Sequence, residues 1–159
     1  MKNFKESYKK LAKEYNLPSF EELDKEFELL YLREIFEISH PLSFVRRRMF
    51  DKISQVSGTI HEILQPNTSS IVSLEESSFF SKEEKKENLT GLFKEMMGLL
   101  RSSTSLEIEL TEEKEAESIK ETFQKWNDVK PQLIEIASKL KDGWKKETDS
   151  SKKDHNYVG

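Results

Sequence analysis

Apolar residues recur at the period of an α-helix along most of the chain, and the longest such stripe lies between Leu42 and Ile63. Its members are separated by three or four residues: Leu42, Val45, Met49, Ile53, Val56, Ile60 and Ile63. This spacing places them on one helical face. It predicts a helix from about Pro41 to Gln65, roughly 35 Å long at ~1.5 Å per residue.

Two further helices are predicted before this stripe. The first is short, ends near Asn16, and carries several lysines opposite its apolar face. The second begins at Ser19, whose spacing to Glu22 is that of a capping box. The density of β-branched and aromatic residues from Phe27 to Ile38 leaves an extended stretch as an alternative there.

The residues after the long stripe predict a loop, a helix and a connector. Residues 67–80 are rich in Ser and Thr and predict a loop with one short turn around Val72 to Glu76. A second capping box at Ser81 opens a helix that should stop near Ser102. Apolar and acidic residues alternate from Leu106 to Leu110, a pattern that predicts an extended connector.

Two more helices are predicted toward the C-terminus. Thr111 is placed to cap the first, which ends near Asn127. The second runs from about Val129 to Glu147, with Pro131 in its first turn. The sequence therefore predicts an all-α, single-domain bundle of about five to six amphipathic helices over residues 1–148, followed by a flexible C-terminal tail, 149–159.

Composition agrees with a helical bundle and narrows the function classes. The chain has 159 residues, enough to bury a core, and its five Gly and four Pro are too few for a fold rich in tight turns. It contains no Cys, which excludes disulfides, thiolate metal sites and a Cys nucleophile. No apolar run is long enough to span a bilayer, so we expect a cytoplasmic protein without a membrane partner.

The densest positive charge lies on the long predicted helix. Arg46, Arg47 and Arg48 fan around it, and Lys52 follows Arg48 by four residues on the same ridge. Such a ridge suits a phosphate or an acidic partner. It could equally pair with residues 17–38, where seven acidic and two basic residues give a net charge of −5. The sequence leaves these alternatives open.

Two other groups of residues are weaker candidates for a functional site. The end of the tail, Tyr157, Val158 and Gly159, is a short segment that could dock in a partner's pocket. Glu37 and His40 have the Glu-x-x-His spacing of metal-binding bundles, but the second pair that such a site needs is missing. There is no phosphate-binding glycine loop and no nucleophile elbow, and we expect no cofactor.

Four segments carry a resemblance to a known group of proteins. They are LPSFEEL at 17–23, RRRMFDKI at 46–53, ILQP at 63–66 and EKEAE at 113–117. Together they resemble a set of small, uncharacterised helical proteins from archaeal genomes. The resemblance implies an archaeal cytoplasmic protein of unknown function and brings no catalytic residues.

The chemistry of the chain therefore favours a binding protein over an enzyme. The first hypothesis is a non-enzymatic helical protein-interaction module that binds a protein partner or itself. The alternative is an RNA- or ribosome-associated factor that uses the basic first helix and the Arg46–Lys52 ridge. A metal-binding helical bundle built around His40 is the second alternative.

Overall fold

A computed structural model describes residues 4–32 and 39–154, and within them every regular element is helical. In chain order the elements are α1 (Phe4–Tyr15), α2 (Phe20–Phe27), η1 (Leu29–Leu32), α3 (Pro41–Leu64), α4 (Ile71–Ser78), α5 (Lys82–Glu84), η2 (Lys85–Leu89), α6 (Thr90–Ile108) and α7 (Glu112–Asp154). The short α5 and η2 lead directly into α6, so the described part of the chain forms six helices and confirms the all-α prediction.

The chain divides into two compact units. Unit 1 comprises Met1–Gly58 and Lys94–Asn127, and unit 2 comprises Thr59–Phe93 and Asp128–Gly159. Each of the three chain crossings between the units falls inside a helix, in α3, α6 and α7.

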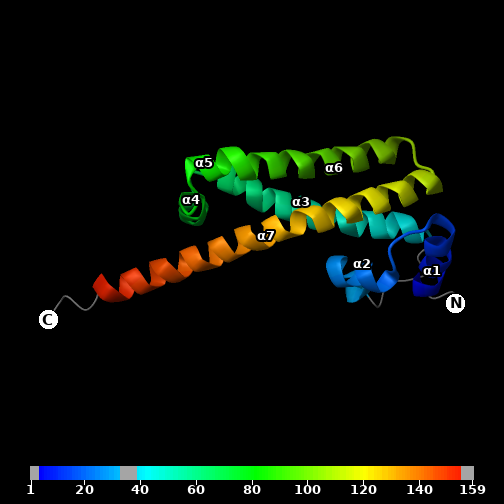
Figure 1. The fold of residues 1–159 in the computed structure, drawn as a ribbon, viewed down its shortest axis with the longest axis horizontal. Helices are drawn as coiled ribbons and strands as arrows, with labels where there is room; N and C mark the ends of the chain where they lie inside the picture. Colours follow the sequence, from blue (N-terminus) through cyan, green and yellow to red (C-terminus); the bar gives the residue numbers. More distant parts are fainter. Residues whose placement is uncertain (1–3, 33–38, 155–159) are drawn as a thin grey trace. The chain divides into compact units, whose positions relative to one another are not determined.

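Unit 1 is built on the first part of α3, where the predicted stripe is buried. Leu42, Val45, Met49 and Ile53 are all 2% exposed or less. The part of α6 in this unit runs antiparallel to the start of α7, as Figure 1 shows. Buried residues of the other helices complete the core: Tyr8, Phe20, Leu23, Phe27, Met96, Leu100, Ala116, Ile119 and Trp126.

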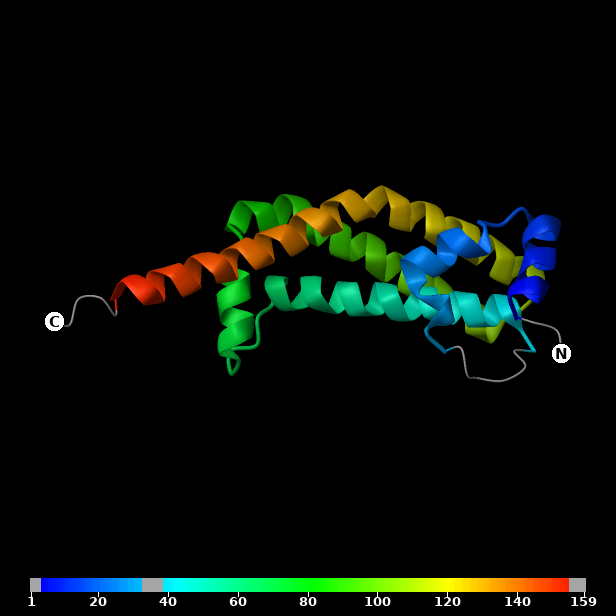
Figure 2. The same cartoon turned by 90° about the horizontal axis from the view of Figure 1, so that it is seen from below.

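The helices α1 and α2 cover one end of unit 1 (Figures 1 and 2). The ring of Phe4 packs edge-on against Phe44 of α3, with centroids 5.0 Å apart. The Tyr15 hydroxyl donates a hydrogen bond of 2.9 Å to Glu112 at the start of α7. The capping box at Ser19 is confirmed, because the Ser19 backbone N–H donates to Glu22 Oε2 and the Glu22 N–H donates to Ser19 Oγ.

The second helix ends earlier than its apolar period predicts. Glu28 adopts a left-handed conformation with φ of 54°, and its N–H donates to the Asp24 carbonyl oxygen, which terminates α2. A single 3₁₀ segment, η1, follows it. The remainder of the ambiguous stretch, residues 33–38, lies outside the described residues.

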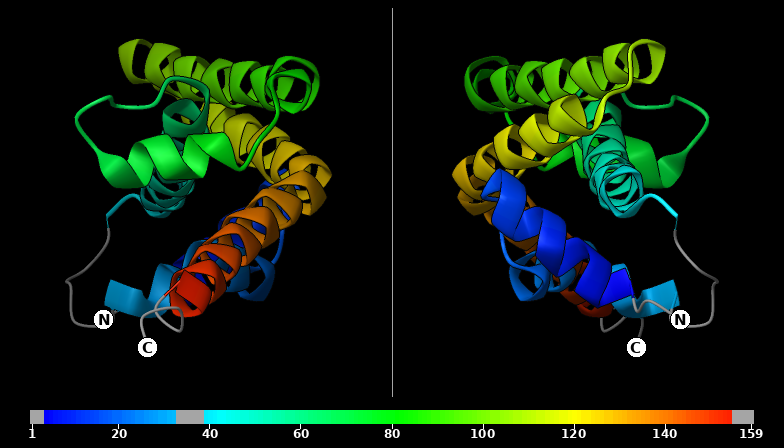
Figure 3. Two further views of the ribbon diagram at one scale, coloured as in Figure 1. Left: turned by 90° about the vertical axis from the view of Figure 1, so that its left-hand side faces the viewer. Right: turned by 90° about the vertical axis from the view of Figure 1, so that its right-hand side faces the viewer.

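Unit 2 contains the end of α3, then α4, α5, η2, the first residues of α6 and the second part of α7. Figure 3 shows α4 lying across the end of α3. The helix α4 corrects the prediction of a loop with one short turn, since it spans eight residues and is capped by Ser70, whose side chain accepts from the Ser73 N–H.

The predicted extended connector is wrong over residues 106–108. Helix α6 does not stop near Ser102 but continues to Ile108. Leu106 is buried in the core and Glu107 pairs with Arg46. Both contacts stabilise the helical conformation of these residues. Ile108 is 87% exposed, so the apolar residues of this alternation do not share one buried face.

The two C-terminal helices are in fact one. The prediction of a break after Asn127 is wrong, because α7 continues through Pro131. Trp126 and Val129 are buried on either side of the expected break, which holds the helix together where proline removes one backbone hydrogen bond. Thr111 caps α7 as predicted, with its Oγ1 accepting from the Lys114 N–H.

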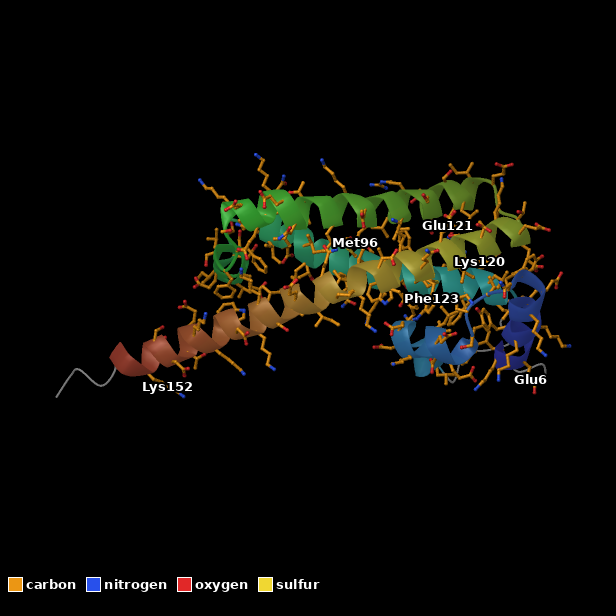
Figure 4. The ribbon with its side chains drawn as sticks, in the orientation of Figure 1. Glu6, Met96, Lys120, Glu121, Phe123 and Lys152 are labelled. Carbon is orange, nitrogen blue, oxygen red and sulfur yellow. The ribbon has the colours of Figure 1, made fainter. Side chains whose placement is uncertain are left out.

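The helix α7 also includes residues 149–154, which the sequence placed in the tail. Side chains support its last turns, since the Ser150 and Ser151 hydroxyls donate to the Glu147 carbonyl oxygen. The exposed side chain of Lys152 projects from the end of α7 in Figure 4. Tyr157, Val158 and Gly159 lie outside the described residues.

Candidate functional site

The arginine ridge is the first candidate, and the structure places its members in different environments. Arg46 is 3% exposed and points into unit 1. Its Nη1 donates a hydrogen bond of 2.8 Å to Ser103 Oγ, and its Nη2 donates to Glu107 Oε1. Its Nε lies 3.5 Å from Glu115 Oε1. Arg46 therefore holds α3, α6 and α7 of unit 1 together and is not available to a partner.

Acidic and hydroxyl groups complete this buried network. Glu115 is 6% exposed and accepts a hydrogen bond of 2.5 Å from the Ser43 hydroxyl. The hydrogen bond from Arg46 holds the pKa of the Glu107 carboxyl below its usual value. A buried cation must be paired and hydrogen-bonded, so these acids account for the burial of Arg46.

The rest of the ridge is partly neutralised within unit 1. Arg48 Nη2 donates to the backbone carbonyl of Glu28 at 3.3 Å, and Lys52 Nζ lies 3.8 Å from the Glu28 carboxylate. Arg47 is exposed. Of the ridge, Lys52 pairs with the predicted acidic segment 17–38, at Glu28, and Arg48 contacts only its backbone. That segment is not the partner of Arg46, which pairs with Glu107 and Glu115.

A metal site at His40 was the second alternative to a protein-interaction module. His40 is exposed just before α3, and Glu37 lies outside the described residues. Over residues 4–32 and 39–154 no group of three or more His, Asp or Glu side chains is arranged to hold a metal ion. In the same residues, no helix has both the length and the apolar character that crossing a bilayer requires.

The helix α4 is amphipathic in the reverse of the usual sense. Its buried residues are serines, Ser73 and Ser77, which are each 5% exposed. Its apolar residues face outward, with Ile71 82%, Val72 55% and Leu74 43% exposed. We call these three residues the α4 apolar face. An ordinary surface helix buries such residues and exposes its serines.

Hydrogen bonds hold α4 in this orientation. The Ser77 hydroxyl donates to the Ile63 carbonyl oxygen at 2.7 Å and accepts from Lys85 Nζ at 2.7 Å. Ser73 Oγ accepts from the Asn67 backbone N–H at 2.9 Å. The buried serines are therefore satisfied, and the orientation of α4 is fixed by polar contacts while its apolar face stays in the solvent.

An aromatic contact ties α4 to α7 within unit 2. Trp144 Nε1 donates a hydrogen bond of 3.1 Å to Glu76 of α4. The Trp144 ring packs edge-on against Phe79, the residue that follows α4, with centroids 5.6 Å apart. This approach depends on Gly143, because a Cβ atom there would lie only 2.4 Å from the Phe79 ring.

A groove of about 690 Å³ lies in unit 2 between the α5–η2–α6 segment and the second part of α7. We call it the unit 2 groove. Its apolar lining residues are Phe79, Phe80, Leu89, Leu92 and Ile136, of which Phe80, Leu89 and Leu92 are buried. Its volume falls within the range of ligand-binding pockets in proteins, about 300–1,000 Å³.

The wall formed by η2 contains one turn of π-helix. The Thr90 N–H donates to the Lys85 carbonyl oxygen five residues earlier, and the Thr90 hydroxyl donates to the same oxygen at 2.7 Å. A π-turn brings residues five apart onto one side of a helix, and Glu84 and Leu89 both line the groove. Such turns occur frequently at functional sites.

One ion pair links the two walls of the unit 2 groove. Lys139 of α7 binds the carboxylate of Glu84 and lies 5.1 Å above the ring of Phe80. The hydrogen bond from Lys139 lowers the pKa of Glu84 to about 2, from an ordinary 4.5. Both side chains remain more than a third exposed, so the pair is a surface contact rather than a buried one.

Sequence reasoning found the arginines but missed both features of unit 2. The serine-rich run from residue 67 to residue 80 predicts a loop, although Ile71, Val72 and Leu74 sit together within it. These three residues do not continue into a stripe of apolar residues at helical spacing. This isolation was the sign in the sequence that they form an exposed apolar surface. No comparable signal marks the groove, because its walls come from residues some 50 positions apart, as Glu84 and Lys139 show.

The chain was also compared with known proteins. No family model matches it, and no curated protein sequence and no solved structure matches it at a significant level.

Proposed function

We propose that the chain is a non-enzymatic helical protein-interaction module and that it binds a partner protein through the α4 apolar face. The observation that carries the proposal is the reversed polarity of α4, which buries Ser73 and Ser77 and exposes Ile71, Val72 and Leu74. We place this module in the cytoplasm, as expected from the sequence.

The energetics of exposure support this choice. Burying an apolar side chain of this size stabilises a protein by about 1.5–3 kcal/mol relative to leaving it in water. Three such residues within four positions leave several kcal/mol of possible stabilisation unused in the free chain. A partner that covers the face would gain that energy, and exposed apolar patches on proteins often mark interaction sites.

The alternative of RNA binding has weaker support. It relied on the ridge from Arg46 to Lys52 and on the basic first helix. Arg46 and Lys52 have acidic partners within unit 1, and on α1 Lys5 and Lys9 both pair with Glu21. A surface that binds phosphates needs cations that remain available for them, so we do not favour this function.

The test compares two triple variants that change the charge of the chain equally. The first is Ile71→Glu with Val72→Glu and Leu74→Glu. The control is Ile108→Glu with Leu110→Glu and Ile134→Glu, which alters three apolar residues that are also exposed. Each tagged chain is purified from native lysate, and co-purifying proteins are quantified by mass spectrometry.

We expect wild-type and control chains to retain the same partner and the α4 variant to lose it. Circular dichroism should show that all three chains are equally helical, since the substituted residues are exposed. Equal recovery of the same proteins by the two triple variants would reject α4 as the binding surface.

A further inference from the structure

The unit 2 groove is lined by both apolar and acidic residues. Acidic residues on its walls outnumber basic ones, with four acids (Glu84, Glu135, Asp142 and Glu147) against two lysines (Lys139 and Lys146), a net charge of −2. Glu84 and Lys139 neutralise each other across the groove. The remaining excess of negative charge lies on α7.

The dimensions of the groove suit a helix. The residues that line it on α7 extend from Gln132 to Glu147, which corresponds to about 22 Å along the helix at ~1.5 Å per residue. A helix of about 15 residues has this length. The half-buried Phe79 and Ile136 would contact the side chains of one face of such a helix, in the manner of known helix-in-groove complexes.

The groove is less suited to an extended peptide. Both of its walls are helices, whose backbone groups are already hydrogen-bonded within each helix. An extended peptide gains affinity by pairing its backbone with an exposed sheet edge, and residues 4–32 and 39–154 contain no strand. A helical occupant brings its own backbone hydrogen bonds and needs only side-chain contacts.

From this charge and shape we propose that the unit 2 groove binds a positively charged amphipathic helix of a partner protein. The apolar face of that helix packs on Phe79 and Ile136, the half-buried apolar residues of the lining, and its flanking Lys or Arg residues lie beside Glu135 and Asp142. The inference depends on the proposed function only in that the occupant is a protein. It involves a surface whose residues are all different from the α4 apolar face.

The test uses two labelled peptides of about 15 residues with the same leucine stripe. One carries lysines on either side of the stripe, and the other carries glutamates at the same positions. Binding to the full chain is measured by fluorescence anisotropy at low and high salt. A small phenylalkyl amine is included as a competitor, to detect a site for small cationic ligands.

We expect the basic peptide to bind at least about tenfold more tightly than the acidic one, and its binding to weaken with salt. In the Glu135→Lys, Asp142→Lys double variant this preference should disappear. The matched control, Glu117→Lys with Glu121→Lys, changes two exposed acids in the first part of α7 and should keep it (Figure 4 labels Glu121).

Three results would overturn the proposal. Equal affinity for the two peptides would show that charge does not select the occupant. No binding of the basic peptide would show that the groove does not bind a basic amphipathic helix. Displacement of the basic peptide by the amine at similar concentrations would assign the groove to a small ligand. The α4 apolar face is unchanged throughout, so each of these results leaves the proposed function standing.

Discussion

Replacing Arg46 by Met tests whether the buried network organises unit 1. The Arg46 side chain is 4% exposed and connects Ser103 and Glu107 of α6 with Glu115 of α7. Methionine keeps most of the length and volume of the arginine stem but removes the charge. The variant therefore leaves the Glu115 carboxylate, itself 7% exposed, without its cation.

The expected loss of stability is large for a single substitution. Removing one partner of a buried ion pair costs about 3–5 kcal/mol, because the remaining charge is neither solvated nor neutralised. Glu107 adds little to this loss, since its side chain is 47% exposed and can return to water. With a urea dependence of about 2 kcal/mol per M, a loss of ~3 kcal/mol lowers the denaturation midpoint by about 1.5 M.

Urea denaturation followed by circular dichroism measures this shift, and two further variants serve as controls. Arg47→Met alters an exposed neighbour and should change the free energy of unfolding by no more than about 0.5 kcal/mol. The double variant Arg46→Met, Glu115→Leu leaves no buried charge and should recover much of the loss. The reasoning fails if Arg46→Met costs no more than Arg47→Met, or if the double variant is no more stable than Arg46→Met.

Two more predictions concern unit 2. Gly143→Ala should lower the midpoint of thermal unfolding, because overpacking against Phe79 costs about 1–3 kcal/mol. Gly91→Ala should raise the midpoint, because a Cβ there meets no atom within 4 Å and alanine favours the helix. Equal shifts in the two variants would contradict the close contact between Gly143 and Phe79. In carboxyl NMR titrations, Lys139→Met should return the pKa of Glu84 from about 2 toward 4.5. Because the folded-state pKa is depressed, the stability contributed by this pair is complete above pH 4.5 and is lost as pH falls toward 2; an unchanged Glu84 pKa in the variant would show that Lys139 is not its cause.

The parts of the fold that sequence predicts well are those governed by local rules. The stripe from Leu42 to Ile63 predicts α3 because its helical period extends over 22 residues. The capping boxes at Ser19 and Ser81 mark the helix starts, because both hydrogen bonds of each box lie within four residues. These signals need no knowledge of what the helix packs against.

The errors occur where distant contacts decide the local structure. The alternation after Leu106 indicated an extended connector, but Glu107 reaches Arg46, 61 positions away, and stays in a helix. Pro131 indicated a new helix, but α7 continues through it, with Trp126 and Val129 buried on either side of the break expected after Asn127.

The candidate site illustrates the same limit. The sequence showed four cations on α3 but not that Arg46 would be buried against Glu115. It also gave no means to predict that Ser77 would be the buried side of α4, because that depends on the Ile63 carbonyl and Lys85. Disagreement between local sequence preference and tertiary environment is expected at functional or strained sites.

Photo-crosslinking from α4 tests the central claim most directly. A photoreactive amino acid is placed at Ile71 in one chain and at the exposed Arg101 of α6 in another, and both are irradiated in living cells. The account predicts one discrete protein adduct from the position of Ile71 and none of that mass from the position of Arg101. The same adducts from both positions, or none from that of Ile71, would contradict it.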